Sequence, residues 1–201
     1  MRKIVVLSFI SLDGVMQAPG GPDEDVDSGF KYGGWTVPYS DEVFGGMMVE
    51  QMSMPFDLLL GRKTYSMWSD YWPKNENGPI GASFKKAKKY VVSSDSDLGL
   101  PWQKASLISG DVVAKLKSLK AEDGPMLQVQ GSANLAQTLF KHDLVDELWL
   151  KTFPVLLGNG KKLFAEGTIP AAFELIETKT TPSGVIFASY KRGGEVKTGS
   201  F

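Results

Sequence analysis

The fold is decided by the stretch Asp57-Leu58-Leu59-Leu60-Gly61-Arg62-Lys63-Thr64-Tyr65. Asp57–Leu60 is a short, mostly apolar run of the kind found in strands buried inside a sheet. After Gly61, an apolar stripe continues at helical spacing from Thr64 to Trp72. The stretch therefore predicts a buried strand that passes through a glycine turn into a helix, as in a βαβ unit.

The same alternation of strand and helix patterns continues on both sides of this stretch. Buried-strand runs occupy residues 3–10, 90–92 and 126–129. Apolar helical stripes occupy residues 43–52, after a predicted N-cap at Ser40, and residues 112–119 and 135–140. Strands that alternate with helices indicate an α/β protein with a mostly parallel sheet and helices on both of its faces.

The C-terminal third has a different pattern. Glu147–Phe153 is typical of a strand, and Phe173–Thr180 and Val185–Lys191 flank the turn Pro182-Ser183-Gly184. Two such runs around a turn predict an antiparallel hairpin at the end of the sheet.

Composition excludes several classes of chemistry. The chain has no cysteine and one histidine, His142, which excludes disulfides, thiolate catalysis and Cys/His zinc sites. Nucleobase deaminases, which depend on such a zinc site, are excluded as well. His142 follows a helix, where we expect an exposed cation rather than a catalytic base. A formal net charge of -1 indicates neither a nucleic acid nor a membrane surface as a partner. With no membrane-spanning run and no export signal, we expect a cytoplasmic protein, and we predict no metal site.

Residues 16–39 form a long stretch, rich in Gly, Pro and Asp, without a secondary-structure pattern. Four aromatic residues inside it favour an ordered lid over a solvated linker; they are Phe30, Tyr32, Trp35 and Tyr39. The tail from Gly193 to Phe201 is expected to be flexible, which leaves residues 1–192 as a single domain.

Two cations, Arg62 and Lys63, fall in the first turn of the helix predicted after Gly61. Cations there are unfavourable by roughly a few tenths of a kcal/mol each, because the N-terminal end of the helix dipole is positive. A bound phosphate would reverse this, since the free N–H groups, both cations and the Thr64 hydroxyl would address it. From spacing alone, a solvated basic turn capped by Thr64 is an equal alternative.

Two further strand ends carry similar residues. Ser93 and Ser94 follow the run at 90–92, and Gly131-Ser132-Ala133 connects the run at 126–129 to the next helix. The carboxyl ends of parallel strands share one rim, where open α/β sheets bind their ligands. Each segment alone is also consistent with a turn or a helix cap, but three together favour one anion-binding cleft.

These motifs, in this order, resemble the reductase family of riboflavin biosynthesis, and especially the stand-alone bacterial proteins related to its C-terminal reductase domain. The resemblance covers residues 2–191 and rests on Ser11-Leu12-Asp13-Gly14, Gly61-Arg62-Lys63-Thr64, Ser93-Ser94, Gly131-Ser132-Ala133, Asp146-Glu147-Leu148 and Pro154–Phe164. It implies the dihydrofolate-reductase-like fold, a three-layer α/β sandwich.

The resemblance also implies an NADPH-dependent reductase that transfers hydride to a small heterocyclic or carbonyl-containing substrate, of the riboflavin-precursor or pterin-like class. It assigns the cofactor phosphates to Gly61–Thr64, the adenosine ribose and its 2′-phosphate to Ser93 and Ser94, and the pyrophosphate to Gly131–Ala133. Gly158 and Gly160 match a loop near the nicotinamide. Gln130 stands where the family usually has a glycine. Dihydrofolate reductases protonate their pterin with help from an acid on the first long helix, where this chain has Glu42 and Glu50.

Two alternatives to this function stay open. One is a non-catalytic nucleotide-binding or regulatory protein on the same fold, and the other is a flavin- or deazaflavin-dependent reductase. By family analogy we expect a homodimer, with the 147–153 strand and the C-terminal hairpin as its interface.

Asp13 is the candidate catalytic residue, because it ends the first strand at the same rim and its carboxylate could bind substrate or relay a proton. A purely structural role in the turn with Gly14 is the equal alternative. Trp35, Met47 and Gln51 are the candidates for lining the substrate pocket.

Overall fold

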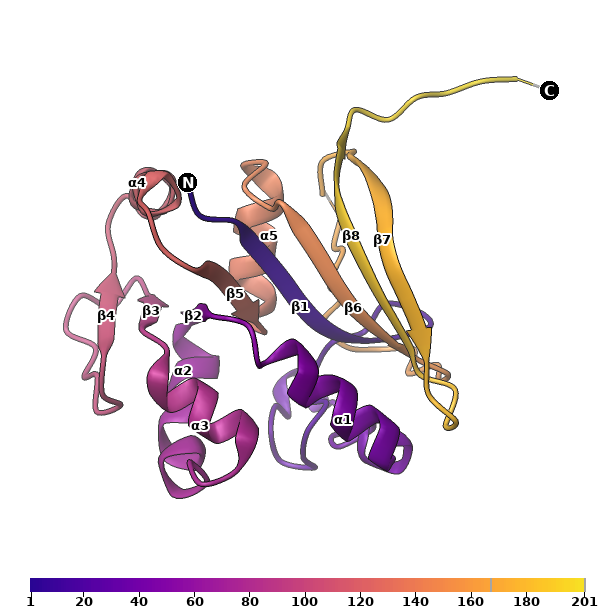
Figure 1. Cartoon of the computed structure of the whole chain (residues 1–201), viewed down its shortest axis with the longest axis horizontal. Helices are drawn as coiled ribbons and strands as arrows, with labels where there is room; N and C mark the ends of the chain where they lie inside the picture. Colours follow the sequence, from indigo (N-terminus) through magenta and orange to yellow (C-terminus); the bar gives the residue numbers. More distant parts are fainter. Residues whose placement is uncertain (167, 201) are drawn as a thin grey trace.

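The computed structural model describes residues 1–166 and 168–200. Eight strands form one sheet in the order β4-β3-β2-β5-β1-β6-β8-β7. The first six strands in this order run parallel, and β8 and β7 are antiparallel neighbours at the end (Figure 1). The strands are β1 Ile4–Ser11, β2 Phe56–Gly61, β3 Lys89–Val92, β4 Ala105–Ile108, β5 Met126–Gln130, β6 Glu147–Phe153, β7 Ala172–Thr180 and β8 Ile186–Gly194.

Helices cover both faces of this sheet. The α-helices are α1 Glu42–Gln51, α2 Arg62–Tyr71, α3 Pro79–Lys86, α4 Val112–Ala121 and α5 Ala133–Lys141, and the 3-10 turns are η1 Asp27–Gly29, η2 Val37–Tyr39 and η3 Trp72–Lys74. Buried side chains of α1, α2 and α3 join one core cluster, and those of α4 and α5 join a second. The result is the predicted three-layer α/β sandwich.

The central strand β1 is apolar at nearly every position because both of its faces are covered. Val5 and Leu7 pack into the core on one face of the sheet, whereas Ile4, Val6 and Ile10 pack into the core on the other. A strand covered by helices on both faces has no solvent side, so it lacks the alternation of a surface strand.

The predicted C-terminal hairpin is confirmed as β7 and β8, which turn at residues 182–184 with Gly184 at φ +85°. β8 continues to Gly194, two residues past the predicted domain end, and residues 195–200 extend away from the body (Figure 1). Phe201, the last residue of the predicted tail, lies outside the described residues.

Three details differ from the sequence predictions. Asp41, not Ser40, caps α1, because its carboxylate accepts a hydrogen bond from the Phe44 N–H at 2.7 Å. The sequence patterns missed β4 and α3, which are only four and eight residues long. The expectation that the 147–153 strand forms a dimer interface is wrong for this strand, because β6 lies buried between β1 and β8.

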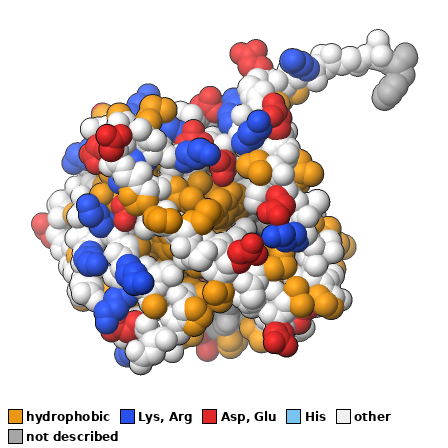
Figure 2. All heavy atoms as spheres, viewed as in Figure 1, with side chains coloured by type: hydrophobic (Ala, Val, Ile, Leu, Met, Phe, Trp, Pro, Cys, Tyr) orange, Lys and Arg blue, Asp and Glu red, His pale blue; other side chains and the backbone are white. Residues whose placement is uncertain are grey.

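Figure 2 shows that apolar side chains gather towards the middle of one face, while charged side chains are spread around them. Among the described residues, no helix is long and apolar enough to cross a membrane.

Candidate functional site

A cleft of about 1500 Å³ opens at the carboxyl ends of the parallel strands. It is lined by residues of β1, by the turns after β2, β3 and β5, and by the 16–27 part of the predicted lid. The structure brings together in its lining nine residues that the sequence assigned to a cofactor: Gly61, Arg62, Lys63, Thr64, Ser93, Ser94, Gly131, Ser132 and Ala133. Three strand ends that are distant in the sequence therefore share one site, as the parallel topology requires.

The turns after β2 and β5 touch each other at the base of the cleft. The Thr64 Oγ1 and Ser132 Oγ atoms are 2.8 Å apart, within hydrogen-bond distance. A Cβ added to Gly61 would lie 2.3 Å from Ser132 Oγ, so this contact requires glycine at position 61. Gly131 has φ +87°, a left-handed conformation that favours glycine.

Two of the helices that begin at the cleft, α2 and α5, have uncapped N-termini. Among the described residues, no side chain caps α2 after Gly61 or α5 after Ser132. By contrast, Asp41 caps α1, and Asp111 caps α4, whose first residue Val112 also lines the cleft. Ser132 has φ +69° and its hydroxyl turns to Thr64 instead of capping α5. Free backbone N–H groups and two positive dipole ends therefore face the same cleft, a favourable environment for an anion.

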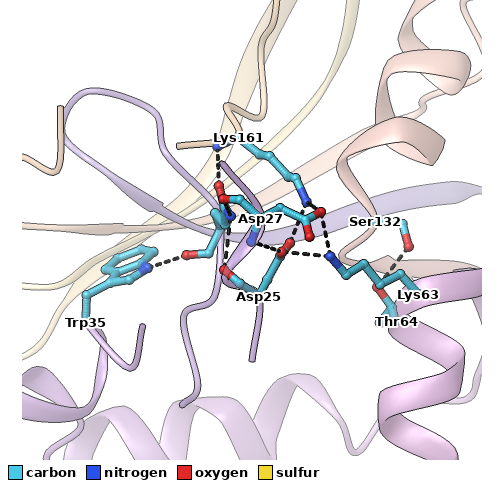
Figure 3. A network of polar contacts seen from close by, with 8 residues as sticks. Asp25, Asp27, Trp35, Lys63, Thr64, Ser132 and Lys161 are labelled. Carbon is cyan, nitrogen blue, oxygen red and sulfur yellow. Dashed lines mark hydrogen bonds and ion pairs between the residues drawn. The ribbon is translucent and has the colours of Figure 1, made fainter. Parts of the chain in front are cut away.

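A cluster of two aspartates and two lysines closes one side of the cleft (Figure 3). Lys63 Nζ lies 2.8 Å from Asp25 Oδ1 and 2.6 Å from Asp27 Oδ2. Lys161 Nζ lies 2.6 Å from both Asp25 Oδ2 and Asp27 Oδ2. We call these four residues the latch, because they join the lid to α2 and to the segment after β6.

The latch carboxylates are stabilised in their charged form. Hydrogen bonds from Lys161 and then Lys63 lower the pKa of Asp27 to about 2. Burial opposes this for Asp25, but the same two lysines together hold its pKa below the ordinary value. Hydrogen bonds from both aspartates raise the pKa of Lys63, so all three groups are ionised at neutral pH.

Gln17 organises the lid from inside. Its buried amide donates to the backbone carbonyls of Asp25 and Asp27 and accepts from the Lys161 N–H. Its own backbone carbonyl accepts the indole N–H of Trp35 at 2.7 Å. Phe30 and Trp35 are buried in the adjoining core, so the predicted order of this segment is confirmed, and its role as a lid stays a prediction.

Asp13 lies outside the cleft lining and its carboxylate is fully engaged. It accepts hydrogen bonds from the Ser11 hydroxyl and from the N–H groups of Leu157 and Gly158. The bond from Ser11 in particular lowers the pKa of Asp13. These contacts fix the loop after β6 to the end of β1, and the catalytic role of Asp13 stays a prediction.

The other predicted residues also lie outside the lining. Gly158 and Gly160 belong to the loop that Asp13 anchors, and a Cβ on Gly160 would meet Val15 at 2.6 Å. Trp35 packs edge-on against Phe153 with ring centroids 5.2 Å apart. Met47 packs against the core, and Gln51 Oε1 is buried with no hydrogen-bond partner among the described residues.

Several lining residues escaped the sequence prediction. Asp25, Asp27 and Lys161 carry charge into the cleft, and Trp68, Tyr71 and Trp72 supply much of its aromatic surface. The three aromatic residues were visible as part of the helical stripe after Gly61, but a stripe of this kind is usually core.

An α/β sandwich with a cleft at the carboxyl ends of its parallel strands is the dihydrofolate-reductase-like fold. The solved structures that it resembles share its fold: a riboflavin biosynthesis protein from Shewanella sp. PV-4 has a TM-score of 0.64 at 22% identity, and matches 94% of this chain and 98% of its own. Dihydrofolate reductase from Enterococcus faecalis, solved as a complex with NADP(H) and RAB-propyl, has a TM-score of 0.59 at 13% identity, over 95% and 96% of the two chains.

The particular family follows from the sequence comparison. The chain belongs to the RibD C-terminal domain family, whose model matches residues 2–187. The protein YyaP of Bacillus subtilis (strain 168) is 28% identical over 198 residues, which are 96% of both chains. The protein YwjB of the same strain is 26% identical over 178 residues, 89% of this chain and 91% of its own. The predicted family and fold are confirmed.

Proposed function

We propose that this protein is a reductase that binds NADPH in the cleft and uses it to reduce a small substrate. The observation that carries the proposal is the convergence of two uncapped helix N-termini, two hydroxyls and two cations, Arg62 and Lys63, at one rim of the sheet. This set of donors and charges suits a ligand with several phosphates.

The residues fit a dinucleotide in three respects. Gly61 and Gly131 keep Cβ atoms out of the base of the cleft, where a pyrophosphate would approach the backbone. Ser94 and exposed Arg62 lie at neighbouring strand ends, where a 2′-phosphate would find a hydroxyl and a guanidinium. A volume of about 1500 Å³ also leaves room for a second ligand beside the first.

Bound NADPH would supply the hydride, and the chain would supply binding, orientation and exclusion of water. The turns after β2 and β5 would hold its phosphates. The lid, fixed by Gln17 and the latch, covers one side of the cleft and would keep water from the reacting atoms.

A titration of the protein with NADPH and with NADH tests the cofactor, with the fluorescence of the five tryptophans as signal. We expect NADPH to bind more tightly than NADH, and Arg62→Ala to weaken NADPH binding about five- to tenfold, since a charge-assisted hydrogen bond is lost.

Lys117→Ala is the matched control, because it removes an exposed positive charge from α4, outside the cleft lining. Equal losses in the two variants would indicate a general charge effect, and no binding of either nucleotide would refute the proposal. Tight binding without NADPH oxidation by any acceptor would favour the non-catalytic alternative, and a yellow purified protein would favour a flavin.

A further inference from the structure

One end of the cleft is aromatic rather than basic. Met67, Trp68, Tyr71 and Trp72 project from the second half of α2 and from η3, and Phe9 of β1 lines the same cleft. Because a helix rises 1.5 Å per residue, Trp68 and Tyr71 lie about 6 and 10 Å along the axis from Thr64. We call Trp68, Tyr71 and Trp72 the aromatic wall.

The aromatic wall is held rigidly from behind. The Trp68 ring stacks on buried Phe84 at a centroid distance of 5.0 Å and an interplanar angle of 24°. Trp72 meets Phe84 edge-on at 4.7 Å and Tyr71 edge-on at 5.1 Å. These rings are fixed by packing before any ligand arrives, so a planar ligand would bind with little loss of side-chain freedom.

Charge argues against a phosphorylated substrate beside the proposed cofactor. The cations in the cleft lining are Arg62, Lys63 and Lys161, and the latch aspartates already engage two of them. The lid adds Asp23 and Glu24 to the same lining. With the proposed cofactor phosphates on Arg62, an anionic group of a second ligand would find no unengaged cation among the described lining residues, so a neutral substrate is favoured.

Hydrogen-bond donors at this end are few. The indole N–H of Trp72 is buried and has no acceptor among the described residues. The Gln130 amide, which also lines the cleft, is directed to Gln128 Oε1 at 2.8 Å and to Met52 Sδ. Recognition of a ligand here therefore rests on stacking rather than on an array of polar contacts.

From the aromatic wall and the charges around it, we propose that the substrates are neutral, planar aromatic carbonyl compounds without a phosphate group. This inference rests on the proposed function, because NADPH would be the two-electron reductant. The carbonyl carbon accepts the hydride, the π electron pair of the C=O bond moves onto oxygen, and that oxygen takes a proton from water. The products are the alcohol, NADP⁺ and the hydroxide left from water.

Calorimetric binding of three aldehydes to the intact protein, with and without saturating NADP⁺, tests this inference. The probes are 2-naphthaldehyde, cyclohexanecarbaldehyde and glyceraldehyde 3-phosphate, and NADP⁺ allows binding without turnover. We expect 2-naphthaldehyde to bind about tenfold more tightly than either of the others, from its stacking on the aromatic wall. Tighter binding of the phosphorylated aldehyde, or equal binding of the cyclohexane compound, would overturn the inference.

Two variants locate the binding site. Trp68→Leu should weaken 2-naphthaldehyde binding about five- to tenfold, and so should Tyr71→Ala, whose side chain is 56% exposed and contributes little to the core. Phe164→Ala removes a partly exposed aromatic residue outside the cleft lining and the lid, and should change nothing.

Unchanged binding in both cleft variants would refute the role of the aromatic wall. Since the NADPH affinity of each variant is measured separately, and the aldehydes are also titrated without nucleotide, failure of the substrate class and failure of the cofactor proposal give different results.

Discussion

Two lysines, Lys89 of β3 and Lys151 of β6, are buried completely within the sheet. Neither Nζ atom has a hydrogen-bond partner among the described residues. Lys89 Nζ lies 4.3 Å from the centroid of the Trp102 ring, and Lys151 Nζ lies 5.5 Å from that of Phe187. Burial lowers the pKa of Lys89 to about 8 and that of Lys151 well below its ordinary value. Burying these amines therefore opposes their charged form and reduces stability at neutral pH.

Lys89→Met should stabilise the protein at pH 7. The folded pKa of Lys89, about 8, lies below the ordinary value of 10.5. Between these values the unfolded chain binds a proton that the folded chain has released, so stability of the natural protein rises with pH through this window. We expect the variant to gain about 2 kcal/mol at pH 7, after allowing for the lost contact with Trp102, and to lose part of this pH dependence.

Urea unfolding of both proteins at pH 7 and pH 10 measures this effect. Lys88→Met, at the exposed neighbouring position, is the matched control and should leave the unfolding free energy unchanged. A destabilised Lys89→Met variant would show that the lysine has a favourable role in the folded protein.

At the scale of elements, local patterns predicted the strand-to-helix turns of the site but not the latch. Gly61 and the cations after it are adjacent in the sequence, so their placement follows from one strand and one helix. Asp27 meets Lys161 across 134 residues, and no local pattern connects the two. Such a contact depends on where the whole lid lies, which is a property of tertiary structure.

The latch should compete with the proposed cofactor for Lys63. Its two aspartates hold the ammonium group that would otherwise face a phosphate. In the Asp25→Asn/Asp27→Asn double variant, we expect NADPH to bind about two- to fivefold more tightly at low salt, the range that partly exposed ion pairs contribute. Proteolysis within residues 20–27 should also become faster, because the lid loses its ties to Lys63 and Lys161.

The fluorescence titration used for Arg62→Ala measures the affinity, and limited proteolysis reports on the lid. Asp23→Asn is the control, since it removes a lining carboxylate for which, among the described residues, no lysine partner lies within ion-pair distance. Weaker NADPH binding in the double variant would mean that the latch prepares the site rather than competing for it.

At the scale of the whole molecule, the sequence predicted the three layers of the sandwich and the change from parallel to antiparallel strands at the end of the sheet. Both follow from periodicity within single segments. The order of the strands depends on pairing between distant segments, such as β5 between β1 and β2, and the pattern within a single segment does not predict it. The role of the aromatic wall was not predicted for a related reason: an apolar helical stripe indicates only packing, Trp68 and Trp72 do pack on the core, and only the complete fold shows that they also line the cleft.

The open edge of the sheet bears on assembly, and we propose that two chains associate through β7. This nine-residue strand pairs with β8 on one side and is the last strand of the sheet. Leu175 and Ile176 on it are 55% and 52% exposed, and a long edge strand with apolar side chains favours pairing with another chain.

Sedimentation should therefore give the natural protein twice the 21.9 kDa mass of one chain. Ile176→Lys should give the single-chain mass, since a lysine on the edge opposes strand association. Val196→Lys changes a similarly exposed apolar residue beyond the end of β8 and should leave the mass unchanged. A natural protein that sediments at 21.9 kDa would refute association. A dimer that persists in Ile176→Lys would place the interface elsewhere. The next surface to mutate would then be the apolar area in the middle of the face shown in Figure 2.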